Sequence, residues 1–137
     1  MKITRVEEIT TRDDVESFEI PSLVGVDAPS SYHINYQNKG FAKFLIDKKS
    51  MAEFSQKLGR IEDSLSRKQL YNIMYDMLKT QDLSGAQLVS ICQSQLVNEV
   101  EPDVIQDLLG GRNAIVQGCI KAYIPLYAFE QYNHDIF

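Results

Sequence analysis

The chain contains few of the side chains that metal sites and nucleophilic sites most often use. Its 137 residues include two histidines, His33 and His134, and two cysteines, Cys92 and Cys119. The histidines lie far apart, and neither an H-E-x-x-H motif nor a paired C-x-x-C motif occurs. A zinc site needs three or four such ligands close together. The sequence therefore predicts no metal site and no cofactor within the chain, and substoichiometric zinc in the purified protein.

Long apolar runs and dense basic runs are also missing. No run approaches the roughly 20 apolar residues that span a bilayer, and the first residues, "MKITRVEEITTRDD", lack the apolar centre of a signal peptide. The formal net charge is −5, and the densest basic run is only "DKKS". Nucleic-acid binding rests on clustered Lys and Arg. We expect no membrane span, no nucleic-acid partner and an intracellular location, in the cytoplasm or alternatively inside an organelle.

The common motifs of catalysis are not found either. The chain has no G-x-S-x-G motif, and "LLGGRN" lacks the spacing of a phosphate-binding loop. Gly110 and Gly111 in that stretch are better explained as the end of a helix. Cys92 and Cys119 lie in apolar helical contexts, "VSICQ" and "QGCIK", which predicts buried thiols. No catalytic residue is predicted.

The first 46 residues read as short extended runs. "ITRVEEIT", "VESFEI", "SYHINY" and "FAKFLI" are rich in β-branched and aromatic residues, and Pro21, Gly25 and Pro29 interrupt them. Apolar residues alternate in the last two runs, as in half-buried strands. Residues 1–46 are therefore predicted to form part of an antiparallel β-sandwich.

The apolar period becomes helical after residue 46. Ser50 with Glu53, and Ser84 with Gln87, have the spacing of capping boxes at helix starts. An apolar stripe follows the first of them, and its members are Ile61, Leu65, Leu70, Ile73, Met74, Met77 and Leu78. "EPDVIQDLLGG" and "NAIVQGCIKAYI" predict two further helices. Residues 47–137 are thus predicted to be a helical, HEAT-like α-solenoid segment, and the fold class to be α+β.

The stretch "GRIEDSLSRKQL" gathers carboxylates, hydroxyls and bases, as an active site would. Glu62 and Asp63 are expected in the first turn of a long helix, where its dipole favours carboxylates. Arg67 follows Asp63 by four residues, an ordinary spacing for a helical ion pair. We interpret the stretch as the charged face of a helix. If Asp63 and Arg67 are exposed, replacing both with alanine should cost at most about 1 kcal/mol.

The same region carries a family resemblance. The segment "IPSLVGVDAP…INYQNKGFAKFLIDKKSMAEFSQKLGRIEDSLSRKQLYNIMYDML" resembles the M1 zinc aminopeptidases (gluzincins), especially the alanyl, aminopeptidase N type, in order and spacing over residues 15–80. The matching residues are Pro21, Leu23, Val24, Gly25, Pro29, Asn35, Phe41, Ala42, Lys43, Asp47, Ser50, Leu58, Glu62, Asp63, Ser64, Leu65, Arg67, Asp76 and Met77. One departure is that Tyr36 and Gln37 stand where similar proteins have acidic residues.

The resemblance implies the junction between a small β-sandwich domain and a C-terminal helical, HEAT-like domain. The family's zinc ligands, peptide-anchoring motif and catalytic tyrosine belong to a preceding catalytic domain. That domain is absent from these 137 residues, so no catalytic or metal residue carries over, and zinc belongs to the full-length family. In the family, the helical domain closes over the catalytic cleft.

Three functional hypotheses remain open. The chain is a non-catalytic accessory or scaffold subunit that binds another protein. Alternatively, it is the C-terminal piece of an active zinc aminopeptidase whose catalytic domain is elsewhere in the enzyme or on another chain. The third hypothesis is a small α+β domain whose similarity is accidental.

The two broken ends of the predicted fold suggest where a partner would bind. A partial sandwich leaves an unpaired strand edge, and a short helical array leaves an apolar face uncovered. We therefore predict a stable complex with at least one other protein, through the N-terminal strand edge and the aromatic tail. The predicted tail residues are Tyr123, Tyr127, Phe129, Tyr132 and Phe137.

Overall fold

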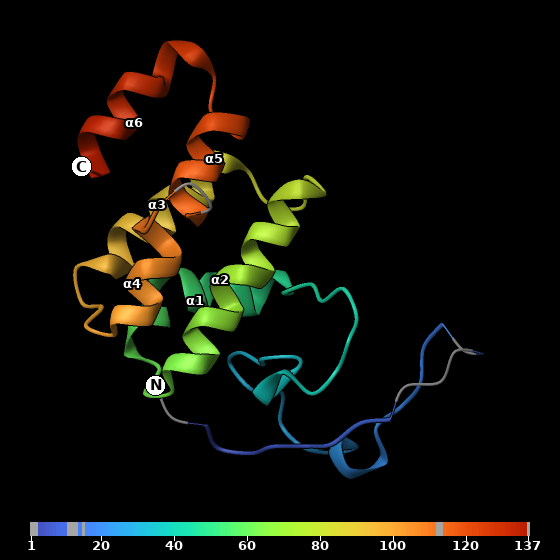
Figure 1. Cartoon of the computed structure of the whole chain (residues 1–137). Coiled ribbons are helices and arrows are strands. Elements are labelled where there is room, and N and C mark those ends of the chain that lie inside the picture. Colours follow the sequence, from blue (N-terminus) through green and yellow to red (C-terminus); the bar gives the residue numbers. More distant parts are fainter. Residues whose placement is uncertain (1–2, 11–13, 15, 112–113, 137) are drawn as a thin grey trace.

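A computed structural model describes residues 3–10, 14, 16–111 and 114–136 of the chain. Within these residues, six α-helices follow residue 47 (Figure 1), namely α1 (Lys48–Lys57), α2 (Ser64–Lys79), α3 (Gly85–Leu96), α4 (Pro102–Leu109), α5 (Ile115–Tyr123) and α6 (Phe129–Ile136). The same residues also form short 3-10 turns, namely η1 (Pro21–Leu23), η2 (Tyr36–Asn38), η3 (Leu58–Arg60) and η4 (Leu126–Ala128).

The described residues contain no β-strand, so the prediction of a partial β-sandwich, and with it the α+β class, is wrong. The described residues between 3 and 46, hereafter the arm, run below and beside the helices as irregular chain (Figure 1). The arm has residues of high β propensity, but strands form only when their backbone groups find a neighbouring strand. Positive φ angles at Asn35, Gln37 and Asn38 also break the last extended run. The division into two domains at residue 46 stays a prediction.

Helix α1 begins one turn earlier than its predicted capping box. Its N-cap is Asp47, whose carboxylate accepts hydrogen bonds from the amides of Lys49 (2.9 Å) and Ser50 (3.1 Å). The Ser50–Glu53 box is therefore wrong: Ser50 is buried inside the helix, and Glu53 pairs with Lys57 at 2.7 Å. Both serine and aspartate are good N-caps, and here the aspartate takes the position.

The later helix boundaries follow the sequence closely. The Ser84–Gln87 capping box at the start of α3 is confirmed, because each side chain bonds to the other's backbone amide. Pro102 is the first residue of α4, where its missing N–H costs nothing. Gly110 ends α4, and Gly111 has a φ of 87°, a conformation that glycine adopts without strain.

The core lies between α1, α2, α3, α4 and α5, and α5 packs against both α3 and α4. Its largest fully buried side chains are Phe54, Leu58, Leu70, Tyr71, Met74, Leu88, Val89, Cys92, Val104, Leu108, Val116 and Ile120. Most of the predicted stripe of α2 is buried in this core. Leu65 is 46% exposed, and Ile73 is partly buried against the core. A HEAT-like order of these helices stays a prediction.

Arg67 is the clearest departure from the predicted charged face. Asp63 is the N-cap of α2 and accepts from the Ser66 amide (3.0 Å) rather than pairing with Arg67. The Arg67 guanidinium is buried and binds both carboxylate oxygens of Glu99, at 2.7 and 2.8 Å. It also donates to the Ile61 carbonyl (2.6 Å). This buried pair ties the start of α2 to the link between α3 and α4.

Candidate protein-interaction surface

The predicted aromatic residues of the tail divide into two groups. Tyr123, the last residue of α5, is 40% exposed, and Tyr127 in η4 is 92% exposed. Phe129 and Tyr132 of α6 pack partly against the core. Phe137 lies outside the described residues. Binding of a partner by this group stays a prediction, and its solvent-facing members are Tyr123 and Tyr127.

Leu126 adds to the exposed part of the tail. It is 88% exposed and adjoins Tyr127 in η4, the turn between α5 and α6. No sequence pattern marks Leu126 as a binding residue. The available signal was Pro125, which ends the apolar period of α5 and so frees the next residues from the helical core pattern.

The arm presents a second and larger set of exposed apolar side chains. Its exposed members are Ile3, Val6, Ile9, Phe18, Val24, Val26, Tyr32, Ile34, Phe41 and Leu45. Phe41 is fully exposed, and Val24 is 68% exposed. Isolated exposed apolar residues are ordinary, but many along one segment mark a surface that another molecule covers. The described residues contain no strand edge of the predicted kind, and binding of a partner through the arm stays a prediction.

One polar cluster organises the beginning of the arm. The Arg5 side chain donates to the Ser22 carbonyl (2.9 Å), and the Ser22 hydroxyl donates to Glu7 (2.9 Å). Hydrogen bonds from Arg5 and Ser22 hold the pKa of Glu7 below its ordinary value. These groups satisfy one another, so the cluster explains a local fold of the arm and requires no ligand.

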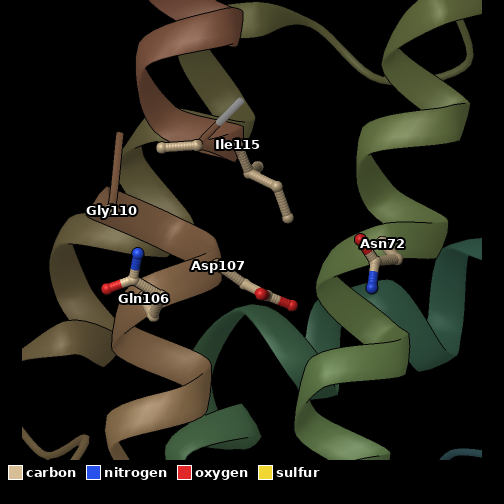
Figure 2. Close-up of a pocket in the computed structure, with 6 residues that line it drawn as sticks. Asn72, Gln106, Asp107, Gly110 and Ile115 are labelled. Carbon is tan, nitrogen blue, oxygen red and sulfur yellow. The ribbon is translucent and has the colours of Figure 1, made fainter. Parts of the chain in front are cut away.

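A cavity of about 310 Å³ opens between α2, α4 and the start of α5. Figure 2 shows Asn72 of α2 across from Asp107 and Gln106 of α4, with Ile115 of α5 above them. Asp107 is bound by Lys68 at 2.9 Å. The polar part of the lining is thus two amides and one carboxylate that is already paired. The lining has no nucleophile beside a base, which nucleophilic catalysis would need.

The two cysteines are confirmed as buried, free thiols. Burial raises the pKa of Cys92 to about 12 and that of Cys119 to about 11. The thiolate is the reactive form of cysteine, so both residues are inert at neutral pH. Cys119 instead donates a weak hydrogen bond to the Gly85 carbonyl (3.4 Å), where α5 meets α3.

The histidines lie on different segments, His33 in the arm and His134 in α6. Over the described residues, no three His, Cys, Asp or Glu side chains come together in a way that could hold a metal ion. The expectation of no zinc site stays a prediction for metal analysis. Within the same residues, none of the helices has both the length and the apolar character that crossing a bilayer requires.

Comparison with known proteins gives one informative similarity. The chain is 26% identical over 107 residues to the aminopeptidase N of Streptomyces lividans. The matched region covers 78% of this chain but spans only 12% of that protein. No protein-family model matches the chain, and no solved structure matches it significantly. The chain is thus distantly similar to an aminopeptidase N, in agreement with the predicted resemblance, while the junction between two particular domains stays a prediction.

Proposed function

We propose that the chain is a non-catalytic, aminopeptidase-related module that binds another protein as an accessory or scaffold subunit. The observation that carries this proposal is the contrast between its two parts. The helices bury a continuous apolar core, whereas the arm leaves ten large apolar side chains, from Ile3 to Leu45, more than a third exposed. Apolar surface of this extent favours association, because covering it removes it from water.

The chemistry of the described side chains supports a binding role. The thiols are buried with raised pKa values, and the acidic group in the cavity is already paired with a lysine. The most strongly built polar feature, the Arg67–Glu99 pair, is enclosed in the fold and so is inaccessible to a substrate. Each of these groups has a structural explanation.

A second candidate function is favoured by the similarity to aminopeptidase N. In this alternative the chain is the C-terminal piece of an active zinc aminopeptidase, which removes N-terminal residues from peptides. The zinc and the catalytic residues would belong to a catalytic domain elsewhere in the enzyme or on another chain. The arm would then be covered by that domain.

Purification of the tagged chain from its native source, followed by mass spectrometry and an alanyl-peptide hydrolysis assay, separates the two functions. A stoichiometric partner without H-E-x-x-H and without activity supports the accessory function. A partner or continuous polypeptide with H-E-x-x-H, whose activity falls when this chain is removed, supports the second. A chain that purifies alone as a monomer contradicts the proposal.

A matched pair of variants assigns any binding to the arm. Val24→Ser with Phe41→Ser changes only exposed side chains, so the fold should be retained. This double variant should weaken capture of the identified partner at least tenfold. The control, Leu65→Ser, changes an exposed residue of α2 and should capture it normally. Equal capture by both variants would show that the arm is not part of the interface.

A further inference from the structure

One part of the arm, residues 29–38, rests on the helices, and we call it the strap. Two hydrogen bonds connect it to α1: Lys49 donates to the Pro29 carbonyl (2.6 Å), and the Tyr32 amide donates to the Ser50 hydroxyl (3.0 Å). Its last turn, η2, packs against α2. In Figure 1 the strap is the cyan to teal segment below α2.

His33 lies within the strap, next to Tyr32. Its ring is half-buried and meets the Tyr36 ring edge-on, with 6.3 Å between ring centroids. The Nε2 atom is buried and has no hydrogen-bond partner among the described residues. A neutral imidazole tolerates this position, whereas an imidazolium would place a charged N–H where no acceptor receives it.

The charges around His33 are few. From α2 the carboxylate of Asp63 faces it, but that group is engaged as the helix cap by Ser66. From the start of α1, Asp47 and Lys49 interact with neighbours of His33 in the strap. Burial lowers the pKa of His33, and the attraction of Asp63 opposes this only in part.

We propose that the strap is a pH-sensitive latch, seated on α1 and α2 while His33 is neutral and released when His33 takes up a proton. Release would uncover the part of α2 against which η2 packs. The released state binds the proton more tightly, because its histidine is solvated. The seated fraction is therefore highest above pH 6.5, the ordinary histidine pKa. As the pH falls below 6.5, the equilibrium constant for seating decreases by at most about tenfold per pH unit, because one proton is taken up.

Amide hydrogen exchange of the full chain, followed by NMR between pH 5 and pH 7, tests the latch. The reporter is the Tyr32 amide, which bonds to Ser50 in the seated strap. Its protection, corrected for intrinsic exchange, should fall several-fold at pH 5. Asp47 and Asp63 do not titrate in this range, because hydrogen bonds from Ser50 and Ser66, respectively, hold their pKa values below the ordinary 3.8.

The two histidines provide a matched control. His33→Gln should abolish the pH dependence of Tyr32 protection, and His134→Gln, in the exposed part of α6, should leave it unchanged. The imidazole titration of His33 in the unmodified chain is a second readout that requires no variant, and its midpoint should lie below 6.5. A midpoint at or above 6.5, or pH-independent protection of Tyr32, would overturn the proposal.

Discussion

At the scale of single residues, the least expected feature is the buried Arg67–Glu99 pair. Burial acts to raise the pKa of Glu99, but hydrogen bonds from Arg67 and from the amides of Glu101 and Val100 lower it overall. Both charges are thus enclosed and satisfied. A buried ion pair adds little net stability compared with apolar residues, but removal of one partner leaves the other charge uncompensated.

Arg67→Ala should therefore lower the free energy of unfolding by about 3–5 kcal/mol, in place of the ceiling of about 1 kcal/mol expected for an exposed residue. Urea unfolding followed by circular dichroism measures this. The control is Lys79→Ala, which removes an exposed pair with Asp76 and should cost at most about 1 kcal/mol. Equal costs for the two variants would show that Arg67 is solvated in solution.

Sequence reasoning failed at Arg67 for a physical reason. The spacing of Asp63 and Arg67 describes only neighbours on one helix, and these neighbours favour a surface pair. Glu99 lies 32 residues away, so its approach depends on how α3 returns along α2. Local spacing carries no information about such a contact. The prediction of strands in the arm failed for a similar reason, because strand pairing depends on a partner segment that local propensity does not supply.

At the scale of elements, the sequence is a better guide. Helical apolar spacing predicted α2 to α5, and local chemistry identified the α3 cap and the end of α4. These signals work because each one acts within a few residues along the chain. The strap was not foreseen, because its seat on α1 and α2 joins segments that no periodicity connects.

Packing between α2 and α5 depends on the small size of Gly118. A Cβ atom at this position would lie 2.6 Å from the Tyr75 hydroxyl oxygen and 3.4 Å from Tyr75 Cζ. The first distance is a clash, whereas the second is ordinary contact. Gly118→Ala should thus destabilise the chain by about 1–2 kcal/mol, because overpacking exceeds the gain of about 1 kcal/mol in helix propensity.

Removing the Tyr75 hydroxyl should reverse the sign of the stability change that Gly118→Ala causes. In a Tyr75→Phe background, Gly118→Ala should stabilise the chain by about 0.5–1 kcal/mol, because the clash is gone and only the helix propensity remains. Thermal and urea unfolding of the four proteins of this double-mutant cycle give the comparison. The same cost in both backgrounds would mean that Tyr75 does not contact α5.

At the scale of the whole molecule, the two exposed apolar surfaces lie far apart. The arm extends below and beside the helices, while η4 and α6 lie at the opposite end of the view (Figure 1). One partner segment of ordinary size would therefore contact one surface and leave the other exposed. The arm carries the larger set of apolar residues, which makes it the primary candidate for association.

The isolated chain should not sediment as a well-behaved monomer at micromolar concentration. Its arm keeps apolar side chains in water that association would cover. Deletion of residues 1–28 removes six of the ten exposed arm side chains and should weaken self-association with unchanged helical circular dichroism, since the helices and the strap contacts begin after this segment. The control, Leu126→Ser with Tyr127→Ser, changes the tail surface and should still associate. If the full chain is a folded monomer, the arm is not an interaction surface, and if only the tail variant is monomeric, association belongs to η4 and α6.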